Sequence, residues 1–319
     1  MKTLILTQSD VNQLLDLGEA ISAVEGAFLA HGRGETRMPS KVYLQLPDNM
    51  GDFRAMPAYI SGSAGVKWVN SHPENPRRHG LPTVMGLYIL SDPLTALPLA
   101  ILDATLLTAV RTGAAAAVAS RHLASKRPPK RLGLVGCGVQ ARFILDAHRQ
   151  LFSDLEVVAA DISRQAAERF SDENDTTVGS IEEAAACDIV CTATPSRRPV
   201  LRRQWLSEEA HVNAMGADAP GKQELELQVL LDADVFVDDR EQAFESGEVN
   251  VPLHQGELSP SGVRGTLGEL LAGHASRSSR SLTVFDSTGL AIQDLALARN
   301  IYEKARHQGM GREVEFIQG

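Results

Sequence analysis

Apolar residues in the middle of the chain occur in short continuous runs separated by helical patterns. This alternation is typical of an α/β domain with a parallel sheet, whose strands are covered on both faces. Leu132–Val135 is the first such run, and Ser281–Phe285 is the last. Between them lie the runs Val157–Ala160, Asp188–Thr194, His211–Met215 and Val235–Val237, with a helical pattern at Ile181–Ala186.

The pattern before residue 113 is different. A short strand is expected at Leu4–Leu6. A helix capped by Ser9 and Asp10 should follow it, and then a second helix that ends near Gly32. From Lys41 apolar positions recur with a period of two, which favours half-buried strands. The further strands are expected at Phe53–Met56, Gly65–Val69, Val84–Leu90 and Pro98–Leu102, with turns at Pro47-Asp48-Asn49, Ser61-Gly62-Ser63 and Ser91-Asp92-Pro93. These short strands predict an antiparallel α+β domain.

Two long helices are expected outside these regions. Ala104–Leu123 is rich in alanine, and a polar linker, Ser125–Lys130, joins it to the first strand of the α/β domain. Ala291–Gln308 also has a helical pattern, and Glu313–Ile317 alternates as a strand does.

The most specific motif is a glycine turn between the first α/β strand and its helix. Gly136-Cys137-Gly138-Val139-Gln140-Ala141 is a G-x-G-x-x-A fingerprint. Gly136 allows the tight turn, Gly138 lets a pyrophosphate approach the backbone, and Ala141 lets the helix pack closely on the strand. The helix N-terminus favours an anion.

Asp161 ends the next apolar run, 20 residues beyond Ala141, where an acid is expected to bind the ribose hydroxyls. Such a carboxylate repels a 2′-phosphate, so the sequence predicts NAD rather than NADP. Arg164 keeps NADP as the alternative, since an arginine nearby accommodates a phosphate.

Composition excludes some kinds of partner and leaves the predicted fold and cofactor unchanged. The 319 residues are 43% apolar and carry a net charge of −9, which argues against nucleic acid or an anionic membrane as a partner. Cys137, Cys187 and Cys191 fit neither a disulfide framework nor a metal site, and no metal is expected. The N-terminal apolar run is too short for a signal peptide and no run is long enough to span a membrane, so a cytoplasmic location is expected.

Polar side chains follow the ends of several predicted strands, where open α/β sheets bind ligands. Thr194 follows one strand, while Asp218 and Lys222 follow the next. Asp218 is either a crevice acid or the N-cap of a helix over Lys222–Leu231. In the N-terminal region, four cations lie among apolar residues: Lys41, Arg54, Lys67 and Arg111. Each alone fits an exposed strand face, but together they favour a pocket for a substrate carboxylate.

Four longer runs resemble the ornithine cyclodeaminase/mu-crystallin family, and within it most closely the archaeal-type alanine dehydrogenases. The runs are Val66–Pro73, Val110–Gly113, Gly216–Lys222 and Phe285–Gly289. The resemblance implies a homodimer whose protomer has two domains. Residues 1–112 with 290–319 would bind substrate and form the dimer, and residues 113–289 would form the Rossmann NAD-binding domain.

The resemblance also implies roles for individual residues. Lys41, Lys67 and Arg111 match cations that hold the substrate carboxylate region, Thr288 matches a residue near the substrate, and Asp218 matches the acid that moves protons, with Lys67 and Lys41 as further catalytic candidates. The positions that would contact NAD, beside Gly136 and Gly138 of the fingerprint, are Thr83, Arg111, Thr112, Val139, Gln140, Asp161, Thr194, Met215, Gly216, Ala217, Asp218, Lys222 and Ser287.

One departure from the family pattern bears on the substrate. Ornithine cyclodeaminases carry an acid before the Met-Pro pair to hold the distal ammonium of ornithine, and this chain has Arg54 there. A second cation disfavours ornithine, so Arg54 is expected to bind a small substrate instead. The sequence therefore predicts NAD-dependent deamination of L-alanine or a similar small amino acid, with the reverse reductive amination. A cyclic ketimine reductase, an ornithine cyclodeaminase, an opine-type dehydrogenase and a mu-crystallin-like binding protein are the alternatives.

Overall fold

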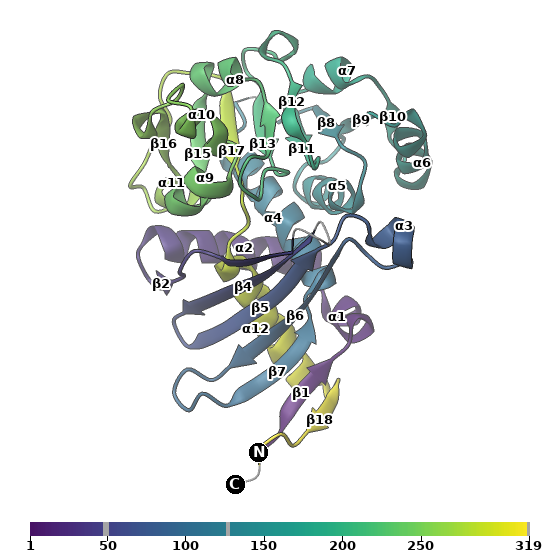
Figure 1. Ribbon diagram of the computed structural model, residues 1–319, viewed down its shortest axis with the longest axis vertical. Helices are drawn as coiled ribbons and strands as arrows, with labels where there is room; N and C mark the ends of the chain where they lie inside the picture. Colours follow the sequence, from purple (N-terminus) through teal and green to yellow (C-terminus); the bar gives the residue numbers. More distant parts are fainter. Residues whose placement is uncertain (47–50, 126–127, 318–319) are drawn as a thin grey trace. The chain divides into compact units, whose positions relative to one another are not determined.

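The computed structural model describes residues 1–46, 51–125 and 128–317. The expected turn at Pro47-Asp48-Asn49 and part of the Ser125–Lys130 linker lie outside these ranges. Within them the chain divides into two compact units, unit 1 with Met1–Arg111 and Leu290–Gly319, and unit 2 with Thr112–Gly289 (Figure 1). None of the described helices is long and apolar enough to cross a membrane.

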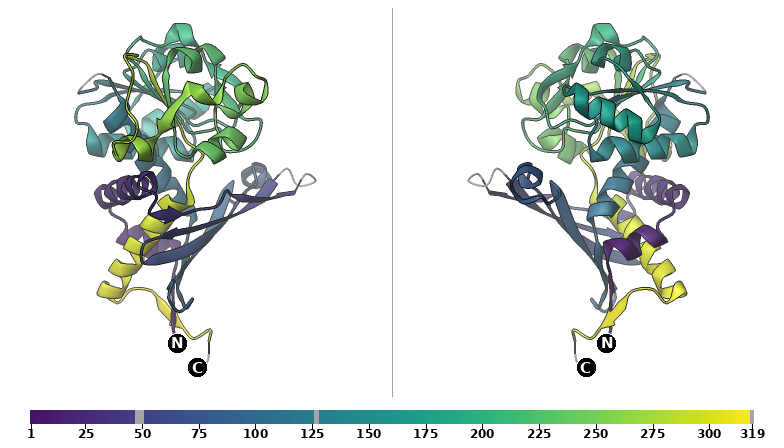
Figure 2. Two further views of the ribbon diagram at one scale, coloured as in Figure 1. Left: turned by 90° about the vertical axis from the view of Figure 1, so that its left-hand side faces the viewer. Right: turned by 90° about the vertical axis from the view of Figure 1, so that its right-hand side faces the viewer.

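Unit 1 is a mixed sheet with helices against one face. Its strands run in the order β18-β1-β7-β6-β5-β4-β2, and β3 also pairs with β4. Helix α12 packs on β4, β5 and β6 and against α2 (Figures 1 and 2). The strands are β1 (Thr3–Leu6), β2 (Thr36–Arg37), β3 (Val42–Leu46), β4 (Gly51–Ile60), β5 (Ser63–Ser71), β6 (Val84–Ser91), β7 (Pro98–Asp103) and β18 (Arg312–Val314), and the helices are α1 (Gln8–Leu14), α2 (Leu17–Gly32), α3 (Asn75–His79) and α12 (Ala291–Gln308).

Alternation along these strands separates a buried face from an outer face. On β4 the residues Asp52, Arg54 and Met56 are buried, and their neighbours are half-exposed. Lys67 on β5 lies opposite Met56 and opposite Tyr88 on β6, so these side chains share the face that α12 covers. The period-two pattern therefore places three charged residues inside unit 1.

Unit 2 is a parallel sheet in the order β10-β9-β8-β11-β13-β17-β15-β16, with helices on both faces (Figure 2). Strand order reverses between β8 and β11, as in Rossmann-type folds. The strands are β8 (Arg131–Val135), β9 (Glu156–Ala160), β10 (Thr177–Val178), β11 (Ile189–Thr192), β13 (His211–Ala214), β15 (Asp234–Val237), β16 (Val263–Thr266) and β17 (Thr283–Asp286), with a separate pair of β12 (Arg197–Leu201) and β14 (Gln223–Leu225).

The helices of unit 2 follow the expected βα alternation. They are α5 (Val139–Leu151), α6 (Arg164–Asn174), α7 (Ile181–Ala185), α8 (Leu227–Asp232), α9 (Arg240–Ser246), α10 (Asn250–His254) and α11 (Leu267–Leu271), with 3₁₀ turns at Arg203–Trp205 and Pro260–Gly262. Helix α4 (Thr105–Leu123) begins in unit 1 and continues into unit 2.

Three details of the sequence-based prediction are wrong. The first helix is capped by Thr7 rather than by Ser9 and Asp10, and Asp10 closes the capping box with Thr7. Strands β1 and β7 are parallel, so the sheet of unit 1 is mixed. The helix expected over Lys222–Leu231 does not form, because Gln223–Leu225 pairs with β12 and the helix begins only at Leu227.

Candidate functional site

The glycine turn of unit 2 has the geometry that its sequence predicts. Gly136 has φ +96°, a conformation that favours glycine, and its amide donates to the carbonyl of Ala160 at 2.8 Å. Asp161 accepts hydrogen bonds from the amides of Cys137 and Ser163, both at 2.8 Å. The carboxylate expected to bind ribose is thus fixed beside the turn, where β8 and β9 end.

The start of α5 suits a pyrophosphate. Gly138 is the N-cap, so no side chain caps this helix, and a Cβ added at Gly138 would meet open space. Val139 and Ile162 are 72% and 98% exposed, and the buried Oε1 of Gln140 has no hydrogen-bond partner among the described residues. An uncapped helix end with a fixed carboxylate beside it fits a dinucleotide such as NAD.

Glu224 connects two loops that were predicted to contact the cofactor. The side chain is fully buried, and its Oε1 accepts from the amide and the hydroxyl of Thr194, both at 2.7 Å. Its Oε2 accepts from the hydroxyl of Thr192 at 2.7 Å and the amide of Gly216 at 2.8 Å. Sequence reasoning missed Glu224, since its role arises only when β14 brings it beside both loops.

Burial raises the pKa of the Glu224 carboxyl, and the four donors oppose that effect. Glu248 lies behind it and accepts from the amides of Glu224 and Leu225. Burial and the neighbouring charge of Glu224 raise the pKa of Glu248 well above its usual range. Gly216 is tightly enclosed, because a Cβ there would lie 2.2 Å from the carbonyl oxygen of Thr194.

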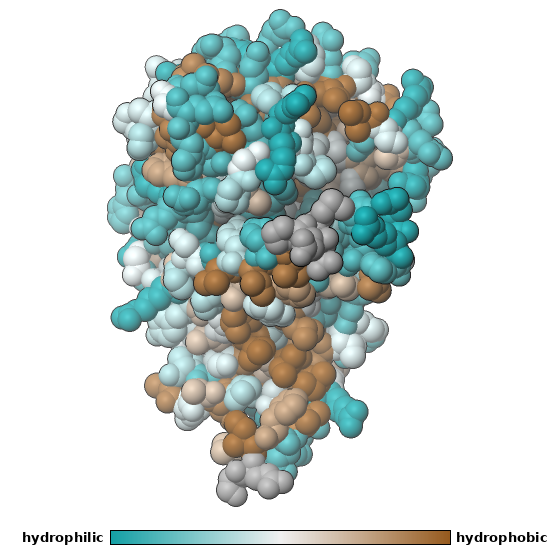
Figure 3. Space-filling view, in the orientation of Figure 1, coloured by the Kyte–Doolittle hydropathy of each residue, from teal (hydrophilic) through white to brown (hydrophobic). Residues whose placement is uncertain are grey.

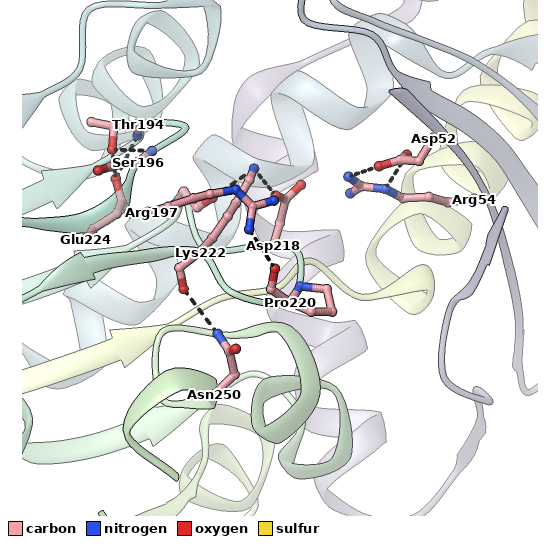
Figure 4. Close-up of polar contacts among 11 residues, drawn as sticks. Asp52, Arg54, Thr194, Ser196, Arg197, Asp218, Pro220, Lys222, Glu224 and Asn250 are labelled. Carbon is pink, nitrogen blue, oxygen red and sulfur yellow. Dashed lines mark hydrogen bonds and ion pairs between the residues drawn. The ribbon is translucent and has the colours of Figure 1, made fainter. Parts of the chain in front are cut away.

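Asp218 and Lys222 form an ion pair in the loop after β13. Lys222 Nζ lies 2.5 Å from Asp218 Oδ1, and both side chains keep some exposure (Figure 4). The backbone of Lys222 bonds to Asn250, and Arg197 donates to the carbonyl of Pro220. The alternative role of Asp218 as a helix N-cap is wrong, since α8 begins nine residues later at Leu227. Asp218 is therefore an accessible acid held by a cation.

Ser287 and Thr288 follow β17 and are held by another buried acid. Asp238 accepts from the hydroxyls of Ser287 at 3.3 Å and Thr288 at 3.1 Å, and from the amide of Gly289 at 2.7 Å. Met215 and Ala217 are buried in the loop after β13, and the buried Thr112 is the first residue of unit 2. Ser287, Thr288, Met215 and Ala217 thus lie in the loops after the neighbouring strands β17 and β13, whereas Thr112 lies on helix α4.

In unit 1, Lys67 and Arg111 share one buried acid, Asp294. Lys67 Nζ lies 2.7 Å from Asp294 Oδ2, and Arg111 Nε lies 3.4 Å from Asp294 Oδ1. Lys67 also donates to Thr108 Oγ1 at 3.2 Å, and Arg111 donates to Gln293 Oε1 at 3.2 Å. Burial, together with the charges of Arg111 and Lys41 and opposed by Asp294, lowers the pKa of Lys67 to about 7.

Arg54 has a partner that the sequence interpretation did not include. Its Nε and one terminal nitrogen donate to the two oxygens of Asp52 at 2.9 and 3.0 Å (Figure 4). Its guanidinium also lies over the ring of Tyr43. Because Asp52 and Arg54 are two residues apart on β4, their side chains lie on the same face. The pair has no net charge, so the argument that Arg54 repels a distal ammonium is weaker than the sequence suggested.

Two other predicted residues lie at strand boundaries of unit 1. Lys41 immediately precedes β3 and contributes a positive charge near Lys67. Thr83 immediately precedes β6, and its carbonyl accepts from the amide of His72 at 2.8 Å.

The fold and these contacts define a class: a two-unit α/β protein with a Rossmann-type dinucleotide site in one unit and a buried cation cluster in the other. The chain belongs to the ornithine cyclodeaminase/mu-crystallin family, whose sequence model matches residues 1–309. It is 47% identical to the alanine dehydrogenase of Archaeoglobus fulgidus, over 99% of both chains.

Two solved structures are similar to this chain over nearly its whole length. An archaeal alanine dehydrogenase dimer with bound NAD superposes with a TM-score of 0.94 at 46% identity, over 99% of this chain and 100% of that one. The Δ1-pyrroline-2-carboxylate reductase of Thermococcus litoralis, in complex with NADH and L-proline, superposes with a TM-score of 0.92 at 32% identity, over 98% of this chain and 100% of that one.

Proposed function

We propose that this protein is an NAD-dependent dehydrogenase that interconverts L-alanine, or a similarly small L-amino acid, with its 2-oxo acid and ammonia. The observation that carries this proposal is the 47% identity with an alanine dehydrogenase across nearly the whole of both chains. Asp161, fixed beside the glycine turn, supports NAD as the cofactor, because its carboxylate suits ribose hydroxyls and opposes a 2′-phosphate.

NAD would lie on the residues around the glycine turn and the loops after β11, β13 and β17. When bound there, NAD would supply the chemistry of hydride transfer at the Cα atom of the substrate. Thr194 and Gly216, fixed by Glu224, and Ser287, fixed by Asp238, would hold the nicotinamide end. Their loops are therefore preorganised by buried carboxylates rather than by the cofactor.

The chain's own polar groups would handle the substrate. Lys67 and Arg111 would bind the carboxylate and polarise the carbonyl of the oxo acid, since a guanidinium and an ammonium both match an anion. Asp218 would take the proton from the attacking water or return it to the leaving amine. Lys222, in contact with Asp218 Oδ1, would hold this carboxylate in position.

A cyclic ketimine reductase is the second candidate, and the similarity to a Δ1-pyrroline-2-carboxylate reductase favours it. The same cations and the same hydride donor serve both reactions. Ornithine cyclisation is the third, because the neutral Asp52–Arg54 pair offers a carboxylate to a distal ammonium. A binding protein without catalysis is disfavoured, since Lys67, Arg111 and Asp218 are all present.

The outer face of the sheet in unit 1 supports a homodimer. Val42, Leu44, Trp68 and Leu87 are 45–63% exposed on this face, and Figure 3 shows apolar residues gathered over these strands. Contiguous apolar surface of this kind is typical of an interface. A similar structure is a dimer, so we propose a second copy of the chain as the partner.

The decisive experiment measures NADH oxidation with pyruvate, with and without ammonium, and with pyrroline-2-carboxylate without ammonium. We expect turnover of pyruvate that depends on ammonium, because only reductive amination consumes it. Turnover of the cyclic imine alone would replace the proposal by a ketimine reductase. The protein would instead be a binding protein if it binds NADH but turns over neither of these substrates, and if it also fails to turn over ornithine in the presence of NAD.

A further inference from the structure

Asp294 lies in the first turn of α12 and is fully buried, as is Lys67, while Arg111 is 8% exposed. A buried carboxylate is costly unless it is paired, and here one carboxylate contacts two cations from different elements, β5 and α4. Two buried cations in contact with a single acid leave one positive charge without a balancing partner within this trio. An anion would complete the cluster.

We propose that Asp294 is a positioning residue: its carboxylate holds the Lys67 ammonium and the Arg111 guanidinium together as a paired cation site for the carboxylate of a small 2-oxo acid. The identity of that anion rests on the proposed function, whereas the pairing rests on the contacts in unit 1.

The neighbouring Gln293 supports this arrangement. Its Oε1 accepts from Arg111 at 3.2 Å and from the amide of Leu290 at 3.2 Å, which fixes the start of α12. Arg111 is the last residue of the first segment of unit 1, and Leu290 is the first residue of the second. The segment that carries Asp294 is therefore held in register with the segment that carries Arg111.

Other groups face Lys67 from each element packed against it. Asp294 raises its pKa, whereas burial, Arg111 and Lys41 lower it. Tyr88 lies opposite on β6, and burial together with the charge of Asp294 raises its pKa well above the usual range, so it stays neutral. On β4 Met56 lies opposite Lys67, and Arg54, paired with Asp52, lies on the same buried face, while α4 adds the neutral Thr108.

Substitution of the Asp294 carboxylate by an amide removes the contributions that raise the pKa of Lys67. We expect Lys67 in the Asp294→Asn variant to lose its proton at lower pH, so that Arg111 alone faces the anion. The upper pH limit for anion binding should then fall by at least about one unit, and affinity near pH 6 should fall about tenfold. The matched control is Tyr88→Phe, which removes a neutral hydroxyl from the same cluster and should leave the pH limit unchanged.

The probe is oxamate, an unreactive analogue of pyruvate, titrated by calorimetry into the NADH-bound protein between pH 5 and 9. Circular dichroism and a cooperative thermal transition report whether each variant, all of them in unit 1, is folded. If Asp294→Asn does not fold, the Lys67→Met/Asp294→Asn double variant replaces the ion pair by neutral groups. Its oxamate affinity should then fall below that of Lys67→Met, because Arg111 also loses the carboxylate that positions it.

Three outcomes would overturn the inference. Wild-type protein that does not bind oxamate has no such anion site. An Asp294→Asn variant that binds oxamate more tightly with the same pH limit would show that Asp294 only opposes the anion. A double variant that binds oxamate as tightly as Lys67→Met, or more tightly, would show that Asp294 does not position Arg111. Failure of the proposed function looks different: oxamate binding would remain sensitive to Asp294, but neither pyruvate nor pyrroline-2-carboxylate would turn over.

Discussion

Asp218 and Asp146 are both partly exposed acids of unit 2 that pair with a cation four residues away in the sequence. Only Asp218 follows a strand end in the candidate site. General acid–base catalysis contributes about 10²–10⁴-fold, so Asp218→Asn should lower kcat by that factor while NADH affinity stays within about threefold. Steady-state kinetics and NADH fluorescence titration measure both quantities. Asp146→Asn should change neither, and an Asp218→Asn enzyme active within about tenfold of wild type would exclude the acid–base role.

Glu224 illustrates a residue that acts through backbone groups. Each of its oxygens accepts from a backbone amide, Thr194 on one side and Gly216 on the other. In Glu224→Gln the new NH₂ group must face one of these amides, and a buried donor without an acceptor costs about 1–3 kcal/mol. We expect the free energy of unfolding to fall by that amount and the Kd for NADH to rise at least about tenfold, since both loops are displaced.

Chemical denaturation and NADH titration check this expectation, with Glu209→Gln as the control because Glu209 is exposed on the same unit. If Glu224→Gln binds NADH as tightly as wild type, the two loops do not depend on the carboxylate. A loss of stability without a loss of affinity would assign Glu224 a purely structural role.

At the scale of elements, helices α4 and α2 contain glycines with opposite environments. A Cβ at Gly113 would lie 2.2 Å from the carbonyl oxygen of Phe143 on α5, whereas a Cβ at Gly26 would meet nothing within 4 Å. Gly113→Ala should therefore force α4 and α5 apart and destabilise by about 1–3 kcal/mol or more. Gly26→Ala should stabilise by roughly 0.5–1 kcal/mol, because alanine restricts the unfolded chain and favours the helix.

Thermal unfolding of both variants beside wild type measures the two effects. The transition midpoint should fall for Gly113→Ala and rise for Gly26→Ala. Equal midpoints for the two variants would mean that α4 and α5 tolerate a wider spacing, and that the glycine in α4 is not required for their contact.

Elements with a strong local signal could be predicted from the sequence. The bounds of α12, Ala291–Gln308, agree with the prediction because its pattern is long and Gly309 ends it. The Lys222–Leu231 segment was misassigned, because a short apolar run suits a strand as well as a helix and only pairing with β12 decides it. Glu224 and Asp294 were also missed, because each contacts its partners only when segments distant in the sequence meet. Asp52 is different, since it lies two residues before Arg54 on the same face of β4, and the period of two in this strand could have identified the pair.

At the scale of the whole molecule, the outer face of the sheet in unit 1 should determine the oligomeric state. Trp68 and Leu87 are cross-strand partners on this face, 45% and 54% exposed, and Trp68 also stacks on Phe53. Burial of Trp68 and Leu87 against a second copy would remove apolar surface from water and so favour the dimer. Aspartates at these two positions would place carboxylates in the interface, and the cost of burying them would oppose association. We therefore expect the Trp68→Asp/Leu87→Asp variant to be a monomer of 34.3 kDa, and wild type to have twice that mass.

Light scattering coupled to size-exclusion chromatography measures these masses, with Leu94→Asp as the matched control. Leu94 is 92% exposed in the turn between β6 and β7, so a charge there should leave the dimer intact. Because the side chains of Lys67 and Tyr88 point to the opposite face, the double variant should retain NADH binding and a folded core. A dimer that survives both substitutions would place the contact elsewhere, and a monomeric wild type would leave the exposed apolar face without the partner proposed for it.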